Sequence, residues 1–166
     1  MSIAIRAATI DDSERIARLV SRLGYPTSSM QMCKRLESIF SDDDYATLVA
    51  CENAEIVGFI GTRVGPLYES DGCYGQIMAL DVAIAHQRRG IGRMLVQAAE
   101  SALIARGASV AVVNSGNQRA GEHAFYEDNG YDFTGRRYKK ALGLQLVEGR
   151  WVDAAAARSR VEAANS

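Results

Sequence analysis

The sequence is poor in the residues that divide or staple a chain. It has only two prolines in 166 residues, and no Ser/Gly/Pro-rich linker interrupts it, so we expect one domain over residues 1–150 and a tail over 151–166. Its three cysteines, Cys33, Cys51 and Cys73, are odd in number and lack the spacing of a metal site. This pattern excludes a disulfide framework and predicts free thiols, no metal and a reducing compartment, which we take to be the cytoplasm.

An excess of charge of one sign and long apolar runs are also missing. The 19 basic and 20 acidic residues give a formal net charge of −1, so the chain as a whole has no electrostatic attraction for nucleic acid or an anionic membrane. No apolar run approaches the roughly 20 residues of a membrane span, and residues 2–6 begin a strand pattern instead of a signal peptide. We therefore expect neither nucleic acid nor a membrane among the partners.

The sequence does contain enough apolar material for one core. It is 48% hydrophobic, and a chain of this length buries roughly 70% of the surface that it exposes when unfolded. Periodicity and turn residues predict strands 3–6, 45–52, 56–67, 74–84 and 109–114, helices 9–23, 28–40, 90–106 and 118–129, and two strands within 133–146. The order β-α-α-β-β-β-α-β-α-β-β predicts an α/β fold with a mixed (α+β) sheet, followed by a tail that is helical or disordered.

The most informative segment is a glycine-containing turn between a strand and a helix, residues 80–93, with the sequence LDVAIAHQRRGIGR. Gly90 and Gly92 allow a ligand to approach the main chain, and the first N–H groups of a helix have no partner within it. Such a helix start favours a phosphate or a pyrophosphate. Positive charge is added at the same place by three arginines, Arg88, Arg89 and Arg93. The turn therefore predicts an anion site, with glycines that serve only chain geometry as the alternative.

Two other glycine-rich phosphate motifs fit this turn poorly. A dinucleotide-binding fingerprint requires a third small residue where Leu95 stands. A phosphate-binding loop of the nucleotide-hydrolase type ends in Gly-Lys-Ser or Gly-Lys-Thr, and that ending is missing. The turn is typical of neither class.

Three motifs, in the right order, resemble those of the GCN5-related N-acetyltransferases, the GNAT superfamily. Gln87-x-x-Gly90-x-Gly92 is similar to the family's acyl-CoA signature, Q/R-x-x-G-x-G/A. Residues 5–12 (IR-x-AT-x-x-D) resemble its first strand and helix start, and residues 125–131 (FYE-x-x-GY) resemble its late helix. The resemblance extends from about residue 3 to residue 146 and is of the small, stand-alone bacterial type. It implies the GNAT fold, with the fourth and fifth strands splayed apart, and an acetyl-CoA-dependent N-acetyltransferase.

The resemblance also implies where acetyl-CoA binds as co-substrate. In the family the pyrophosphate lies on the amides of the glycine turn, and the pantetheine arm pairs with the edge of the fourth strand like an extra strand. The matching positions are Gln87, Arg88, Arg89, Gly90, Ile91, Gly92 and Arg93 for the turn, and the peptide groups of Leu80, Asp81 and Val82 for the strand. A main-chain N–H near Val82 is expected to polarise the thioester carbonyl.

The catalytic residues follow from the same resemblance. Tyr126 matches the family's proton donor to the departing CoA thiolate, with simple packing beside Phe125 as the alternative. The glutamate base of some relatives is replaced by Gln76, which does not accept a proton usefully. Asp81, Glu69 or a water chain to bulk solvent remain as the base. The expected reaction is direct attack of a neutral amine on the thioester through a tetrahedral intermediate.

Three further positions extend or depart from the family pattern. The asparagine that contacts the CoA arm in relatives is replaced by Arg119, so Asn117 is expected to make that contact, with Asn114 as the alternative. His123 lies one helical turn before the expected catalytic tyrosine and either reaches the active site or faces solvent. The basic segment 136–140 binds the 3′-phosphate of CoA or an anionic partner, or forms a solvated face.

The acceptor is a small-molecule or peptide amine of undetermined identity. In the family it enters opposite CoA, over the first two helices, where Tyr25 and Gln76 are the expected binding residues. Acidic segments at 42–44 and 69–72 either attract a cationic amine or are ordinary turns. A catalytically inactive CoA-binding regulatory module and a tRNA-acetylating toxin are the alternative functions. A homodimer through the late strands or the tail is an open expectation.

Overall fold

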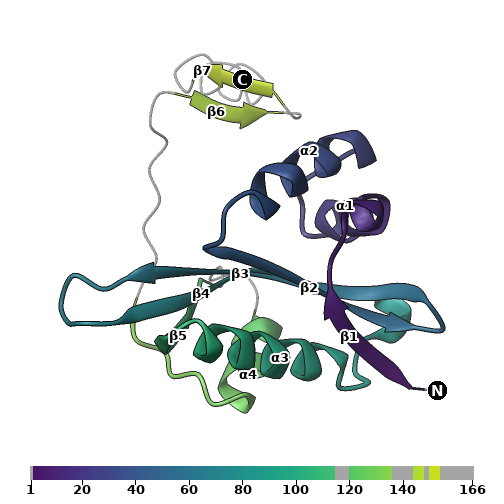
Figure 1. The fold of residues 1–166 in the computed structure, drawn as a ribbon. Coiled ribbons are helices and arrows are strands. Elements are labelled where there is room, and N and C mark those ends of the chain that lie inside the picture. Colours follow the sequence, from purple (N-terminus) through teal and green to yellow (C-terminus); the bar gives the residue numbers. More distant parts are fainter. Residues whose placement is uncertain (1, 115–119, 136–143, 148–149, 154–166) are drawn as a thin grey trace, which may run out of the picture. The chain divides into compact units, whose positions relative to one another are not determined.

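The computed structural model describes residues 2–114, 120–135, 144–147 and 150–153. The chain divides into two compact units, residues 1–133 and 134–166. The first unit contains β1 (Ile3–Ala7), η1 (Ile10–Asp12), α1 (Ser13–Arg22), α2 (Ser29–Phe40), β2 (Tyr45–Glu52), β3 (Glu55–Pro66), β4 (Cys73–Val82), η2 (Ile84–His86), α3 (Ile91–Ala105), β5 (Ala108–Val113) and α4 (Ala120–Asp128) (Figure 1). The second unit contains the antiparallel pair β6 (Leu144–Val147) and β7 (Arg150–Asp153).

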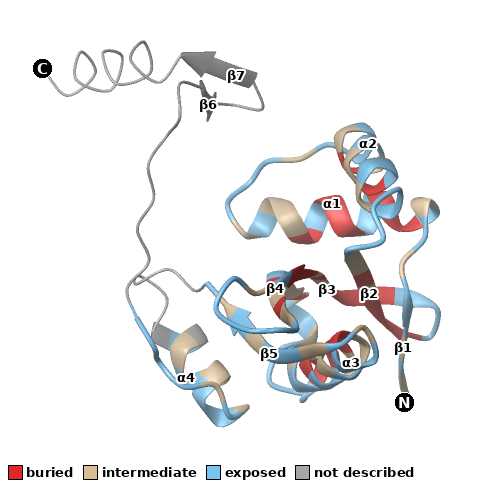
Figure 2. Ribbon diagram, turned by 60° about the vertical axis from the view of Figure 1, so that its left-hand side comes forward, coloured by how far each residue is buried: buried red, intermediate tan, exposed pale blue. Residues whose placement is uncertain are grey.

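The strands of the first unit form one mixed sheet with helices on both faces. Its strand order is β1-β2-β3-β4-β5, antiparallel except for the parallel pair β4 and β5. Figure 1 shows α1 and α2 on one face of the sheet, and α3 and α4 on the other. Buried residues concentrate in the central strands and on the helices that pack against them (Figure 2). The predicted element order and mixed sheet are confirmed.

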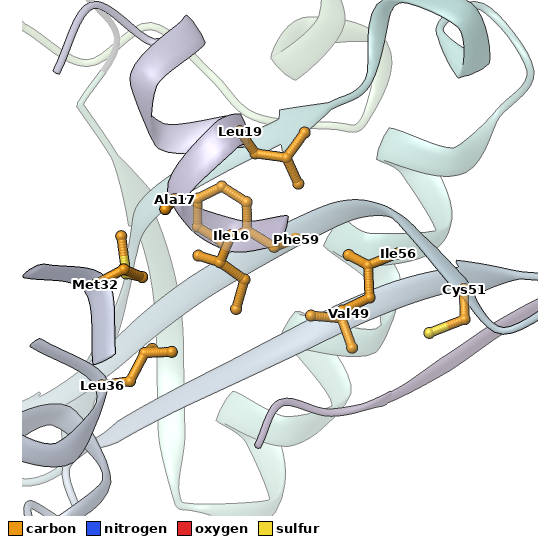
Figure 3. Packing of buried hydrophobic residues seen from close by; sticks show 9 residues of the cluster. All are labelled: Ile16, Ala17, Leu19, Met32, Leu36, Val49, Cys51, Ile56 and Phe59. Carbon is orange, nitrogen blue, oxygen red and sulfur yellow. The ribbon is translucent and has the colours of Figure 1, made fainter. Parts of the chain in front are cut away.

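Each face of the sheet has its own apolar layer. Figure 3 shows the layer beneath α1 and α2, in which Ile16 and Leu36 of the helices lie with Phe59 of β3. On the opposite face, Leu95 of α3 packs in a second cluster with Ile60, the next residue of β3. Because successive strand residues point to opposite faces, both sides of β3 are buried, and this strand is the centre of the fold.

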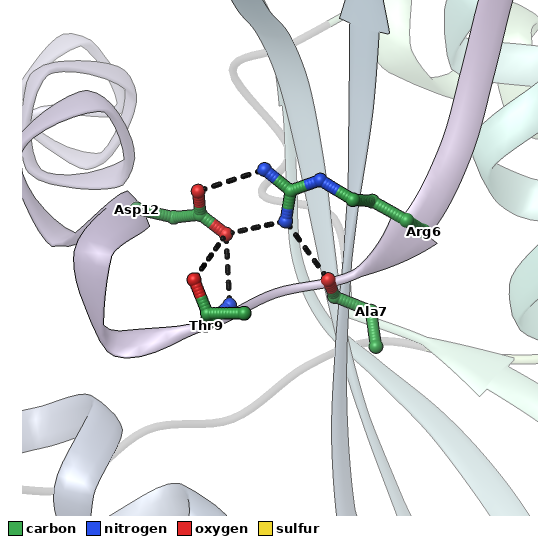
Figure 4. A network of polar contacts seen from close by, with 4 residues as sticks. All are labelled: Arg6, Ala7, Thr9 and Asp12. Atoms are coloured by element: carbon green, nitrogen blue, oxygen red, sulfur yellow. Dashed lines mark hydrogen bonds and ion pairs between the residues drawn. The ribbon is translucent and has the colours of Figure 1, made fainter. Parts of the chain in front are cut away.

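The motif at residues 5–12 links the first strand to the first helix. Arg6 donates two hydrogen bonds to the carboxylate of Asp12, at 2.7 and 2.9 Å, and one to the Ala7 carbonyl oxygen (Figure 4). The Thr9 N–H donates to the same carboxylate at 2.8 Å. The Arg6 guanidinium, followed by the Thr9 N–H, holds the pKa of Asp12 below its ordinary value. Since the Asp12 side chain is only 8% exposed, this pairing satisfies a charge that is otherwise costly to bury.

Replacing Asp12 with asparagine is expected to lower the free energy of unfolding by about 2–3 kcal/mol at neutral pH, because charged hydrogen bonds are lost. The pKa of Asp12 is lower in the folded chain than its ordinary 3.8, so its contribution is present above that value and is lost as the pH falls through the folded pKa. Urea unfolding from pH 7 down to pH 3 measures whether the difference in unfolding free energy between wild type and Asp12→Asn shrinks as the pH falls. Asp11→Asn, at an exposed neighbour, is the control, and equal stability of Asp12→Asn and wild type at pH 7 contradicts the account.

The parallel pair of strands is joined along only part of β4. Pairing with β5 continues up to Ile77 opposite Val113. Directly after Ile77, β4 contains a bulge against β3 in which Met78 is the extra residue. A bulge bends its strand and increases the local twist, and residues 78–82 have no strand partner on the β5 side within the described part of the chain. The predicted splay of the fourth and fifth strands is thereby confirmed, and it leaves an open strand edge.

Some boundaries differ from those that the sequence predicted. Ile84 was expected to end the fourth strand, but it lies in η2 and is 74% exposed; an apolar side chain extended the strand pattern past the point where the chain turns. The last two strands were expected within 133–146 and are β6 and β7, so residues 151–153 of the expected tail belong to a strand. The helix expected farther along the tail lies outside the described residues, and the extents 1–150 and 151–166 stay a prediction.

Candidate active site

The turn between β4 and α3 is anchored to the end of the strand. The Gln87 side-chain Nε2 donates to the Val82 carbonyl oxygen at 2.9 Å. Arg88 and Gly90 have positive φ angles of 62° and 80°, and a Cβ at Gly90 would meet no atom within 4 Å. The helix start has no side-chain cap, so the first N–H groups of α3 lack a helical partner. These oriented donors and the open space at Gly90 fit a phosphate or pyrophosphate group.

Gly92, the second glycine of the turn, serves packing against α4. A Cβ at this position would lie 3.2 Å from two ring atoms of Phe125, closer than ordinary van der Waals contact. Glycine therefore lets α4 approach the start of α3. The rings of Phe125 and Tyr126 meet edge to face, with centroids 5.2 Å apart. The turn thus brings the helix that carries Tyr126 next to the predicted anion site.

Tyr126 lies partly buried among aromatic rings, and its ring meets Tyr131 edge to face at 5.6 Å. The Tyr131 hydroxyl has a partner on α3. Tyr131 donates to Glu100 Oε1 at 3.0 Å, and burial, followed by this carboxylate, raises the pKa of Tyr131. This bond ties Tyr131 to α3, and the role of Tyr126 as proton donor stays a prediction.

Arg89 is bound to an acidic residue at the end of β2. Its Nη1 and Nη2 donate to the two carboxylate oxygens of Glu52 at 3.0 and 2.6 Å, and His86 Nε2 lies 3.3 Å from the same carboxylate. The bond lowers the pKa of Glu52 and raises that of Arg89. Arg89 thus fastens the turn to β2, while Arg88 and Arg93 are the turn's other arginines. Sequence reasoning missed Glu52, which lies 37 residues before Arg89.

The open edge of β4 leads directly into the turn. The Ala83 N–H donates to the Val57 carbonyl oxygen at 2.8 Å, so the peptide groups of Ala83 face β3. Because peptide groups alternate between the two sides of a strand, those of Leu80 and Val82 face the open edge, and those of Asp81 face β3. Of the three positions predicted for the pantetheine arm, Leu80 therefore turns both of its peptide groups to the open edge. Val82 offers its N–H there, because its carbonyl oxygen accepts from Gln87 and Arg22.

Arg22 links the C-terminal end of α1 to the same end of β4. Its Nη1 lies 3.3 Å from Asp81 Oδ2 and donates to the Val82 carbonyl oxygen at 3.1 Å. Asp81, a predicted base, therefore lies beside a positive charge. Arg22 was not singled out from the sequence, because 60 residues separate it from Val82 and no motif joins them.

Comparison with known proteins decides the family. Residues 11–131 match the sequence model described as the acetyltransferase (GNAT) family. The chain belongs to the GNAT family. Members of this family use acetyl-CoA. A search of curated protein sequences finds no match for this GNAT chain.

Solved GNAT structures share the fold of this chain. A GNAT family acetyltransferase from Staphylococcus aureus subsp. aureus USA300_TCH1516 is 28% identical with a TM-score of 0.74, and the alignment covers 86% of this chain and 100% of that one. Glucosamine-6-phosphate N-acetyltransferase from Arabidopsis thaliana is 19% identical, with a TM-score of 0.73 and coverage of 85% and 99%. An aminoglycoside N-acetyltransferase in complex with CoA is 15% identical, with a TM-score of 0.76 and coverage of 85% and 95%.

The residues predicted for the acceptor of this GNAT chain lie in different places. Gln76 is partly buried in β4, whereas Tyr25 is 60% exposed in the connection between α1 and α2. Glu69 is exposed in the loop between β3 and β4. The Asp42 carboxylate accepts the Asp44 N–H at 2.9 Å, which is the hydrogen bond of an ordinary aspartate turn. The structure thus assigns Asp42 a local turn role.

Other predicted contacts fall partly outside the described residues. Asn117, Arg119 and the basic segment 136–140 lie there, so their roles stay predictions. Asn114 follows β5 and is exposed, and His123 is half-buried on α4.

The described residues of the GNAT chain contain no group of three or more His, Cys, Asp or Glu side chains placed to hold a metal ion. Within that same part of the chain, no helix combines the length and apolar character needed to cross a membrane. Cys33, Cys51 and Cys73 are free thiols.

Proposed function

We propose that this chain transfers the acetyl group of acetyl-CoA to a primary amine. The observation that carries the proposal is the continuity of two features: the open β4 edge over residues 78–82 leads into the uncapped start of α3. Pantetheine contains amides that pair with such an edge, and pyrophosphate suits such a helix start. One linear ligand thus meets both features in the order in which its own parts occur.

The residues of the turn bind and orient this co-substrate. The peptide groups of Leu80 and the N–H of Val82 pair with the pantetheine arm, and the N–H groups at Gly90, Ile91, Gly92 and Arg93 receive the pyrophosphate. Gln87 holds the turn against Val82 through its 2.9 Å hydrogen bond. Arg89 acts through Glu52, which fixes the turn in place, and Arg88 adds positive charge beside the phosphates.

The chemistry is direct acyl transfer. The neutral amine nitrogen attacks the thioester carbon, and the N–H near Val82 donates to the oxyanion of the tetrahedral intermediate. As the intermediate collapses, the C–S bond breaks and its electron pair leaves with sulfur. The Tyr126 hydroxyl gives its proton to that thiolate, and the proton lost by the amine restores the hydroxyl through water. The products are the acetylated amine and CoA with a free thiol.

The base that removes the amine proton is Asp81, Glu69 or a water chain. Asp81 is next to Val82 and ion-paired with Arg22, whereas Glu69 lies in the exposed loop between β3 and β4. Gln76 and Tyr25 are proposed to contact the acceptor. The three free thiols support a reducing, cytoplasmic location, and a homodimer stays open.

A free-thiol assay over a panel of primary amines, run beside acetyl-CoA binding, tests this function. We expect thiol release that depends on both acetyl-CoA and one class of amine. Binding of acetyl-CoA without turnover on any amine favours a regulatory module. Absence of acetyl-CoA binding contradicts the proposal.

A further inference from the structure

The face of the sheet toward α1 and α2 carries small residues beside the β4 edge, and the open space above Gly61 is here called the hollow. Ile77 and Leu80 pack on the α3 side, and Ala79 packs on the α1 and α2 side; Gln76, which alternates with Ile77, faces the latter side as well. Gly61 pairs with Ala79 in register, and a Cβ at Gly61 would meet no atom within 4 Å. Two small residues, Gly61 and Ala79, therefore lie side by side beneath this open space.

Arg63 lies at one side of this hollow. It is two residues from Gly61 and on the same face of β3, between Tyr45 of β2 and Gln76 of β4 in register. Its guanidinium lies over the Tyr45 ring, 5.4 Å from the centroid. Among the described residues, Arg63 has no ion pair, and its buried Nε has no hydrogen-bond partner. A guanidinium without an ion pair favours an anionic ligand, because hydrogen bonds between charged groups are the strong ones.

The acidic residues near the hollow do not supply this acceptor. Asp42, Asp43 and Asp44 are exposed in the turn before β2, where water and salt screen their charge. Asp81 faces the same side of β4 as Gln76 but is ion-paired with Arg22 at 3.3 Å. Arg63, on the same face of β3 as Gly61, therefore carries a positive charge that stacks on Tyr45 but has no ion pair in the described residues.

The amine of the proposed reaction must approach over this hollow. With CoA on the β4 edge, the α3 side is occupied by Phe125 and Tyr126, which pack against the cluster there. Leu80 pairs with Ile60, three residues before Arg63. At a rise of about 3.3 Å per residue, Arg63 lies roughly 10 Å along the strand from the reacting edge. A tripeptide spans about the same distance.

We propose that the acceptor carries an anionic group, a carboxylate or a phosphate, and that Arg63 binds this group while the amine reaches the β4 edge. The proposal rests on the proposed acetyltransferase function and adds the chemical class of its acceptor. The enzyme then favours amines with an anion roughly 10 Å away and disfavours polycationic amines.

Three peptides of one backbone test the proposal against the full-length protein with CoA bound. They are Ala-Ala-Ser amide, Ala-Ala-Ser with a free carboxylate, and Ala-Ala-phosphoserine amide, and calorimetry measures their affinities. We expect the carboxylate or the phosphate peptide to bind at least about tenfold more tightly than the amide in wild type, as for a charged hydrogen bond. Arg63→Gln is expected to abolish this preference and Arg63→Lys to retain part of it. Arg18→Gln, at an exposed arginine of α1, keeps the preference.

Equal affinities of the three peptides, no binding of any of them, or a preference that survives in Arg63→Gln overturns the proposal. Thermal unfolding and CoA affinity of each variant exclude a folding defect, and Arg63→Lys provides a folded variant if Arg63→Gln is unstable. Binding of CoA is measured first in the same experiment. If CoA binds and the peptides are not distinguished, the anionic acceptor is wrong; if CoA does not bind, the proposed function fails, and the acceptor class fails with it.

Discussion

Tyr126→Phe is expected to lower kcat at least tenfold while the dissociation constant of acetyl-CoA stays unchanged. A positioned proton donor contributes about 10²–10⁴ in rate, and phenylalanine removes only the hydroxyl. The ring remains, so the edge-to-face contacts with Phe125 and Tyr131 and the packing of α4 are preserved. Steady-state turnover is measured at saturating acetyl-CoA, and calorimetry measures the binding of acetyl-CoA. Together they distinguish the loss of a proton donor, which lowers kcat, from weaker binding of acetyl-CoA.

Tyr131→Phe is the matched control for this result. It removes a hydroxyl from the same aromatic group, but that hydroxyl is bound to Glu100 on α3. We expect a loss of about 1 kcal/mol in stability and no change in kcat. A Tyr126→Phe variant with the turnover of wild type removes Tyr126 from the mechanism and leaves it a packing residue.

Glu52→Gln is expected to raise the KM for acetyl-CoA about tenfold with little change in kcat. The substitution keeps the shape of the side chain but removes the charge that holds Arg89 at 2.6 and 3.0 Å and lies 3.3 Å from His86. The turn is then held less firmly against β2, and the apparent affinity falls with the fraction of molecules in the binding arrangement. Because Glu52 does not touch the reacting atoms, saturating acetyl-CoA restores turnover.

Glu55→Gln is the control, since Glu55 also forms an ion pair with an arginine, Arg15, at 2.9 Å, but on an exposed surface. Its removal is expected to leave both constants unchanged, as is usual for exposed pairs. A different arrangement of Arg89 predicts that Glu52→Gln lowers the KM for acetyl-CoA instead of raising it. If Arg89 binds the pyrophosphate directly and Glu52 competes for it, the KM falls, and that outcome contradicts the anchoring role.

The sequence predicted the parts of the site that depend on local pattern. The apolar strand, the glycines of the turn and the late FYE-x-x-GY motif each follow from neighbouring residues, and the structure places the three close together through Gly92 and Phe125. The role of the motif at 5–12 is also local, because Arg6 and Asp12 are only six residues apart. Local spacing is sufficient in these cases because the partners lie on adjacent elements.

The contacts that the sequence did not reveal depend on the assembled sheet. Glu52 reaches Arg89 and Arg22 reaches Val82 across 37 and 60 residues, so no window of the sequence contains both partners. Gly92 was expected to admit a ligand, whereas in the fold it admits the Phe125 ring. The unpartnered Arg63 Nε likewise emerges only from the register of β2, β3 and β4.

Titration calorimetry of the wild-type chain with acetyl-CoA tests the central claim most directly, because the claim is that the open β4 edge and the start of α3 form one site for this molecule. The account predicts saturable binding of one acetyl-CoA per chain, weakened in Glu52→Gln and unchanged in Tyr126→Phe. Absence of saturable binding to the folded wild-type chain contradicts it.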